Sequence, residues 1–73
     1  MNRLSVSTLH DDCRHYGDML TCVETCIGGI FVTTKSFLYA GDIYFFVIAR
    51  GKIEQALRVY NKRYGGICVE QLV

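Results

Sequence analysis

The stretch IFVTTKSFLYAGDIYFFVIA, residues 30–49, decides the fold class of this chain. Residues 30–39 and 42–50 are rich in β-branched and aromatic side chains, which is typical of strands. Between them Ala40-Gly41, followed by Asp42, is a turn signal. We therefore predict two antiparallel strands joined by a tight turn.

A further strand is predicted before this pair. Residues 19–27, MLTCVETCI, are rich in Thr and Val, and Gly28-Gly29 separates them from Ile30. Two glycines between two apolar residues favour a two-residue hairpin, because glycine adopts positive φ freely at both turn positions. Residues 18–50 are thus predicted to form a three-stranded antiparallel meander.

The third predicted strand is apolar on both faces. Ile43, Phe45, Val47 and Ala49 alternate with Tyr44, Phe46 and Ile48. Such a strand needs cover on both sides. We expect a helix on one side, and a loop, the N-terminal helix or a second protomer on the other.

A short helix is predicted before the meander, over residues 8–16. Ser7 is its expected N-cap, and Gly17 its expected stop. Asp11 and Asp12 are expected in its first turns, where the helix dipole favours anions.

A second helix is predicted after the meander, over residues 52–64. Ile53, Ala56, Leu57, Tyr60 and Tyr64 follow the spacing of a helix that packs on a sheet. Glu54 stands four residues before Arg58, which favours an ion pair on a helix surface. Gly65-Gly66 is the expected end, and residues 67–73 are read as a last strand. The predicted fold is α+β in the order α-β-β-β-α-β, with a right-handed crossover that makes the last two strands parallel.

Length and composition limit the class of protein. With 73 residues the chain is expected to form one domain, 1–73, with a thin core. The start lacks an apolar signal segment, and Lys35 and Asp42 interrupt the apolar middle, so we expect a cytoplasmic protein that does not enter a membrane. The formal net charge of +1 argues against a protein that mainly coats nucleic acid.

Metal binding and catalysis have one candidate cluster. Its residues are of the types that bind zinc, and a metal would stabilise a thin core. The cluster consists of His10, Cys13, His15, Cys22 and Cys26. No pair has the spacing of a common zinc module, and on one strand Cys22 and Cys26 would lie ~13 Å apart. His10 stands three residues from Cys13 and can activate a thiol on a helix, but no oxyanion hole or phosphate loop accompanies the pair. We therefore predict no cofactor, no metal and no enzymatic activity, and keep a zinc-stabilised module as an alternative.

Charge is divided unevenly along the chain. Residues 1–34 carry two basic and four acidic side chains, whereas residues 35–73 carry six basic and three acidic ones. Arg and Tyr are favoured anchors in protein interfaces. The predicted partner-binding residues are the basic set and two aspartates of opposite charge: Arg50, Lys52, Arg58, Lys62, Arg63, Asp11 and Asp12.

The closing stretch VIARGKIEQALRVYNKRYGGICVEQLV resembles, in layout, the strand–helix–strand ending of small phage-encoded inhibitor proteins. These include anti-CRISPR proteins and inhibitors of host enzymes. The resemblance implies a blocking protein that binds a large complex without chemistry.

The leading expectation is a non-enzymatic protein-binding module, of the inhibitor type, that acts on a larger protein or ribonucleoprotein complex such as a CRISPR effector. One alternative is a small RNA- or DNA-binding domain that uses the basic helix 52–64. Another is a homodimer that associates through its sheet edges or its apolar face.

Overall fold

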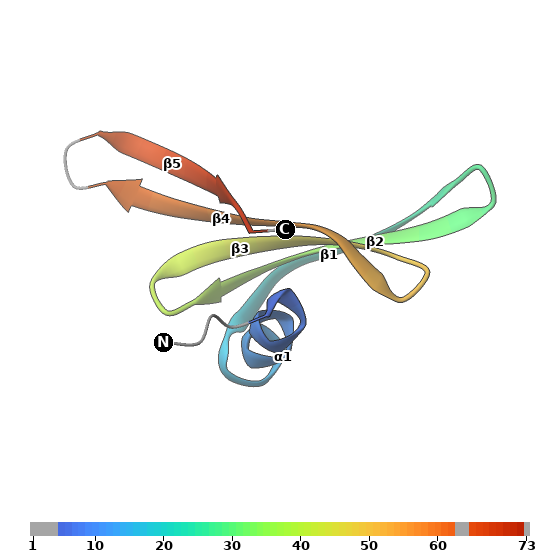
Figure 1. Ribbon diagram of the computed structural model, residues 1–73, viewed down its shortest axis with the longest axis horizontal. Coiled ribbons are helices and arrows are strands. Elements are labelled where there is room, and N and C mark those ends of the chain that lie inside the picture. Colours follow the sequence, from blue (N-terminus) through green and yellow to red (C-terminus); the bar gives the residue numbers. More distant parts are fainter. Residues whose placement is uncertain (1–4, 63–64, 73) are drawn as a thin grey trace.

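Five consecutive strands follow one helix, and strands that are neighbours in the sequence are neighbours in the sheet (Figure 1). The computed structural model describes residues 5–62 and 65–72. The sheet order is β1-β2-β3-β4-β5, and every pairing is antiparallel. The elements are α1 (Val6–Tyr16), β1 (Asp18–Ile27), β2 (Ile30–Tyr39), β3 (Asp42–Ala49), β4 (Lys52–Lys62) and β5 (Gly66–Gln71). The α+β class and the predicted three-stranded meander are confirmed, and the meander continues for two more strands.

Two-residue turns connect the first four strands. Gly28-Gly29 and Ala40-Gly41 form the two predicted turns, and Arg50-Gly51 forms a third. All six residues have positive φ, between 51° and 82°. Positive φ at both central positions belongs to the turn type whose twist matches that of paired strands. The third turn explains why the chain returns as a strand after residue 51.

The N-terminal helix is confirmed, but it begins earlier than predicted. Its N-cap is Ser5, whose hydroxyl accepts a hydrogen bond of 3.1 Å from the Thr8 N–H, so the prediction of Ser7 as the cap is wrong. The helix therefore starts at Val6, and the first turn holds no acidic residue. Asp11 and Asp12 lie too far along the helix to interact with the positive end of its dipole.

Gly17 ends the helix as predicted, and its N–H donates a 3.0 Å hydrogen bond to the Cys13 carbonyl. A Cβ at this position would lie 2.8 Å from the Cys13 carbonyl oxygen and 2.9 Å from that of Leu38. Only glycine allows the chain to pass this closely from α1 into β1.

The predicted helix over residues 52–64 is wrong: residues 52–62 form β4, and Arg63 and Tyr64 lie outside the described residues. A bulge explains the misleading spacing. Ile53 pairs with Ile48, and Gln55 pairs with Val47, the neighbour of Ile48 on β3. Glu54 therefore has no partner on β3 and is the extra residue of the bulge. The bulge places Ile53 and Ala56 on the same face although they are three residues apart, as in a helix.

The last strand is antiparallel to β4 and does not pair with β3, so the predicted parallel crossover is wrong as well. The strand–helix–strand ending that carried the resemblance to phage inhibitors is therefore three consecutive strands, within the described residues.

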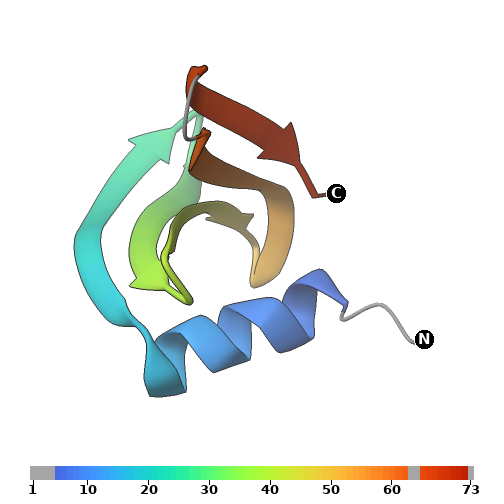
Figure 2. The same ribbon diagram turned by 90° about the vertical axis from the view of Figure 1, so that its left-hand side faces the viewer.

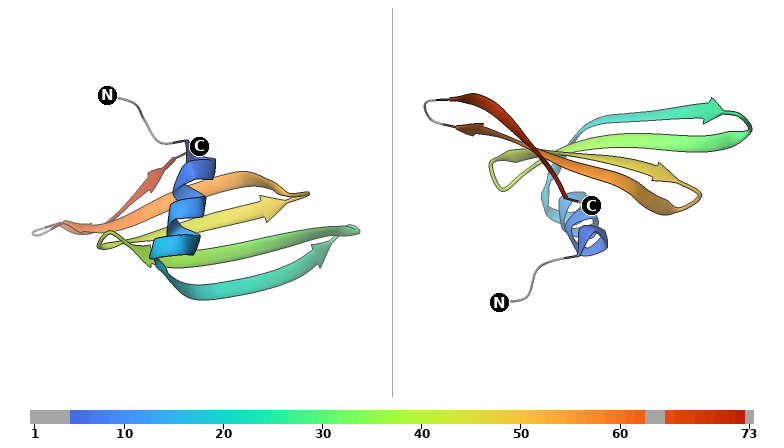
Figure 3. Two further views of the ribbon diagram at one scale, coloured as in Figure 1. Left: turned by 90° about the horizontal axis from the view of Figure 1, so that it is seen from below. Right: turned by 45° about the horizontal axis from the view of Figure 1, so that its top comes forward.

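The sheet has two different faces. Helix α1 crosses one of them, here called the helix face, and the opposite one is called the outer face (Figures 2 and 3). The core lies between α1 and the helix face and consists of Cys13, Phe37, Tyr44, Phe46 and Ala56. The predicted two-sided β3 is confirmed: Tyr44 and Phe46 are buried under the helix, whereas Phe45 and Val47 belong to the outer face. In the described part of the chain no second layer covers the outer face.

The fold is extended for its length. Its principal extents are 43 × 28 × 20 Å, and its radius of gyration is 13.0 Å. A compact domain of this length has a radius of about 11 Å. No helix among the described residues has the length and apolar character needed to cross a membrane.

Candidate protein-binding surface

The charged residues predicted to bind a partner do not form one surface. Asp11 and Lys52, predicted as anchors of opposite charge, line the same hollow between the start of α1 and the β3–β4 turn. Arg50 lines a different hollow, between the β1–β2 and β3–β4 turns. Asp12 is half-buried, and the side chain of Lys62 and all of Arg63 lie outside the described part. The basic face expected on a helix is thus dispersed.

Arg58 is held by its own sheet. Its guanidinium donates to the Glu70 carboxylate, directly across the β4–β5 pair, and lies 5.3 Å from the centroid of the Tyr60 ring. The predicted partner Glu54 is replaced by Glu70 because residue 58 stands on a strand and not on a helix. A hydrogen bond with Tyr44 raises the pKa of Arg58 above its usual value. Burial lowers it, and the hydrogen bond and charge of Glu70 raise it again. The Arg58 guanidinium is therefore occupied by contacts within the sheet and is not free to bind a phosphate.

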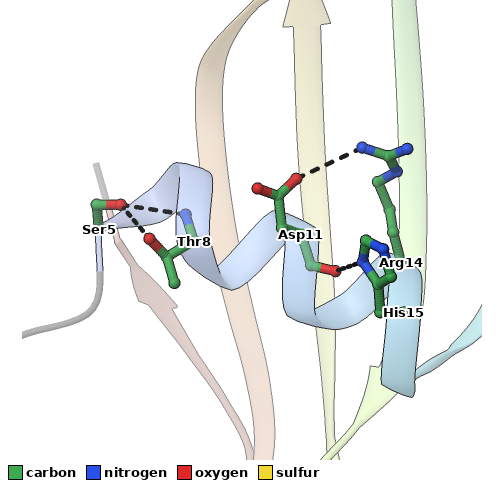
Figure 4. Close-up of polar contacts among 5 residues, drawn as sticks. All are labelled: Ser5, Thr8, Asp11, Arg14 and His15. Atoms are coloured by element: carbon green, nitrogen blue, oxygen red, sulfur yellow. Dashed lines mark hydrogen bonds and ion pairs between the residues drawn. The ribbon is translucent and has the colours of Figure 1, made fainter.

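The polar contacts along α1 are local (Figure 4). Arg14 lies 3.4 Å from the Asp11 carboxylate, and both side chains are more than half exposed. His15 Nδ1 is 2.8 Å from the Asp11 carbonyl oxygen. An exposed ion pair of this kind contributes about 0–1 kcal/mol. It partly neutralises Asp11, which weakens that residue as an acidic anchor.

The proposed histidine and cysteine cluster is divided between the core and the surface. The His10 ring lies 4.9 Å from the Phe46 ring, and burial, then Lys35 and Arg14, lower its pKa. Cys13 is fully buried, and burial followed by Asp12 raises the pKa of its thiol to about 11. A thiol with this pKa stays protonated near neutral pH and is a poor nucleophile.

Cys22 and Cys26 are exposed on β1, four residues apart on a strand as predicted. Within residues 5–62 and 65–72, no three His, Cys, Asp or Glu side chains gather as a metal site would require.

The outer face has an unusual composition, which follows from the register of the four strand pairs. Among its paired described residues, the charged members are Asp18 and Lys52, and Lys52 lies opposite Ala49 beside the β3–β4 turn. Asp18, at the beginning of β1, is paired with Leu38 at the rim. A one-layer antiparallel sheet usually turns a polar face to water. The members of this face are mainly aliphatic: Val23, Ile27, Ile30, Val32, Leu38, Ile43, Phe45, Val47, Leu57, Val59, Ile67 and Val69.

Large apolar side chains of this face are exposed at both of its edges. Leu38 is 41% exposed, Val23 55%, Val69 62%, Ile27 63% and Ile67 69%. The centre is less exposed: Phe45, Val47 and Leu57 are only partly exposed, and Ser36 is buried with its hydroxyl 2.6 Å from that of Thr21. Neighbouring exposed apolar groups without charges are typical of protein interfaces.

One sequence signal indicated this surface, the two-sided apolar β3. It could not show how far the surface extends, because the helical reading of residues 52–64 removed β4 and β5 from the sheet.

No family model, curated protein or solved structure matches this chain.

Proposed function

We propose that this chain is a non-enzymatic protein-binding module that docks on a larger protein or ribonucleoprotein complex through the outer face of its sheet. The observation that carries the proposal is the apolar area of the outer face, whose paired charged residues, Asp18 and Lys52, lie only at strand ends, with Val23, Leu38 and Val69 exposed on it. The cores of protein interfaces are depleted of charged residues and apolar in just this way.

In this proposal the predicted charged residues lie at the rim of the interface and not at its centre. Arg50, at the β3–β4 turn, is exposed and stands at one end of the sheet. Polar residues commonly form the rim of an interface, where they influence association rate more than affinity. The nucleic-acid alternative loses its basis, because it required a basic helix over residues 52–64.

An inhibitory role is part of the proposal. A module of 73 residues with an apolar docking face and a protonated, buried Cys13 is suited to occupying a surface on its partner. Blocking by occupancy needs no chemistry, so the inhibitory role rests on the docking face and not on the strand–helix–strand resemblance, which the three consecutive strands replace.

The test is affinity capture from the native host with three tagged variants. Val69→Lys places a charge on the outer face, and Phe31→Lys places the same charge at a residue that is 74% exposed on the helix-face side. Arg50→Glu tests the charged anchors without changing the outer face, to which Lys52 belongs by register. We expect one stoichiometric partner, identified by mass spectrometry, to be retained by wild type and Phe31→Lys but lost with Val69→Lys.

Nuclease treatment of the lysate separates a protein partner from one held through RNA. Retention of the partner by Val69→Lys together with its loss in Arg50→Glu would refute docking through the outer face. Capture of no stoichiometric partner would refute the binding module itself.

A further inference from the structure

The outermost strand β1 is an unprotected sheet edge. It pairs with β2 on one side, and all ten of its residues are exposed. Soluble proteins usually protect an edge with Lys, Pro, a bulge or a covering element. Between Asp18 and Ile27 there is neither Lys, Arg nor Pro, and the bulge at Leu20 affects only the beginning of the strand. Residues 21–27 are therefore free to pair with another strand.

The backbone groups of this edge point outward in a regular order. Ile27 and Ile30 flank the Gly28-Gly29 turn, whose positive φ values suit a hydrogen-bonded two-residue hairpin. Bonded and non-bonded pairs alternate along an antiparallel ladder. From Ile27 backward, the N–H and C=O groups of every second residue, Cys22, Glu24 and Cys26, are thus directed away from β2.

We propose that β1 pairs with β1 of a second copy of this chain, antiparallel about a two-fold axis at Val23, so that two five-stranded sheets become one ten-stranded sheet. The outer faces of the two copies then lie side by side on one surface. This pairing uses the edge of the sheet rather than its face, so it does not depend on the proposed function.

The sequence of β1 selects this register. An axis at Glu24 would set two carboxylates directly opposite each other, which is unfavourable. An axis at Cys22 would bring Glu24 against the bulged Leu20 and shorten the ladder. An axis at Val23 sets Val23 opposite its own copy, Thr21 opposite Thr25 of the second copy, and Glu24 opposite an uncharged Cys22. Like β-branched pairs of this kind stabilise neighbouring strands.

The exposed area of the chain favours a second copy as the occupant. The chain exposes 5537 Å². A monomer of 8.3 kDa is expected to expose about 4600 Å². The excess of roughly 900 Å² is close to the ~800 Å² that each partner hides in a standard interface. A homodimer with two-fold symmetry needs only one self-complementary patch, and residues 21–25 supply it.

The first experiment tests the register by disulfide trapping. In a chain with Cys22→Ser, Cys26→Ser and Cys68→Ser, Val23→Cys is compared with Thr25→Cys under oxidised glutathione. In the proposed register the two residues at position 23 face each other, within reach of a disulfide. The two residues at position 25 would be ~13 Å apart. We expect covalent dimer from Val23→Cys at least ten-fold above that from Thr25→Cys, and equal yields would overturn the register.

The second experiment tests the dimer without covalent trapping. Sedimentation equilibrium at micromolar concentrations is expected to give twice the chain mass for wild type. Val23→Lys sets two ammonium groups opposite each other and should give a monomer, whereas Val69→Lys, at the other edge of the sheet, should stay dimeric. Far-UV circular dichroism verifies that both variants keep the fold.

A monomeric wild type would overturn the proposal, as would a Val23→Lys dimer. Because Val69→Lys is the variant expected to lose the larger partner, loss of docking and loss of dimerisation appear in different variants. The two proposals can therefore fail separately.

Discussion

Replacing Phe46 by alanine is expected to remove a large part of the stability of the fold. The Phe46 side chain is fully buried, 6.0 Å from the Phe37 ring centroid and 4.9 Å from that of His10. Truncating a buried Phe to Ala costs about 3–5 kcal/mol. A domain of 73 residues has a total free energy of unfolding of about 4–11 kcal/mol. Because few residues share this core, Phe46→Ala should leave the chain close to its unfolding midpoint at 25 °C.

Urea unfolding followed by far-UV circular dichroism measures the loss, and tyrosine fluorescence gives a second probe because the chain has no Trp and five Tyr. Phe31→Ala is the matched control: Phe31 is 74% exposed, so its truncation should change the free energy of unfolding by about 0.5 kcal/mol or less. Phe46→Leu keeps a measurable transition if the alanine variant is unfolded. Equal losses for Phe46→Ala and Phe31→Ala would refute the placement of the core between α1 and the sheet.

Two further predictions concern the helix and its contacts. Gly17→Ala should destabilise the fold by about 1–3 kcal/mol, because the added Cβ would clash with the backbone oxygens of Cys13 and Leu38. Thermal denaturation measures the change, and Ser7→Ala, at an exposed residue, is the control. A loss for Gly17→Ala no larger than the loss for Ser7→Ala would contradict the prediction. Burial lowers the pKa of His10 below 6.5. Near pH 6.5 and below, the unfolded chain therefore binds a proton at His10 more readily than the folded chain does. The free energy of unfolding should then fall as the pH drops through 6.5. Urea midpoints between pH 7.5 and 5 should fall less steeply for His10→Leu than for wild type, and identical slopes would refute the effect.

The first half of the fold could be predicted because its signals are local. Gly28-Gly29 and Ala40-Gly41 determine two turns, and the β-branched stretches between them determine the strands. Turn chemistry of this kind acts over a few residues and needs little tertiary context. The start of α1 was predicted wrongly at Ser7, because Ser5 and Ser7 are the same residue type and the sequence does not show which of them caps the helix. Only the hydrogen bond from Thr8 identifies Ser5.

The second half could not be predicted because its structure depends on partners distant in the sequence. Residues 52–62 pair with β3 on one side and with β5 on the other. Intrinsic propensity for a helix is weak, and tertiary pairing often overrides it. The bulge at Glu54 also shifted the alternation of β4 by one residue, so that Ile53 and Ala56 have a helical spacing on a strand.

The charged residues of the predicted site illustrate the same dependence. Arg58 was expected to face solvent from a helix, whereas β4 aligns it with Glu70 of β5. Asp11 and Lys52 were predicted as anchors of opposite charge from different halves of the sequence, and the crossing of α1 over the sheet brings both to one hollow. Charge counts along the sequence thus indicate which residues are present, and only the pairing of strands decides which of them are free to bind.

The open outer face and the unpaired edge of β1 have a common origin in the arrangement of one helix against a five-stranded sheet in the described chain. One helix of eleven residues covers only part of one face of a five-stranded sheet, so the second face and one long edge remain in water. Sheets of this kind lower their free energy when another chain hides apolar surface or completes the ladder, and such binding stabilises only the folded state. The unfolding midpoint of wild type should therefore rise with protein concentration, while the difference between Phe46→Ala and Phe31→Ala, which leave β1 unchanged, should remain the same. Core packing and association then contribute separately to the stability of this protein.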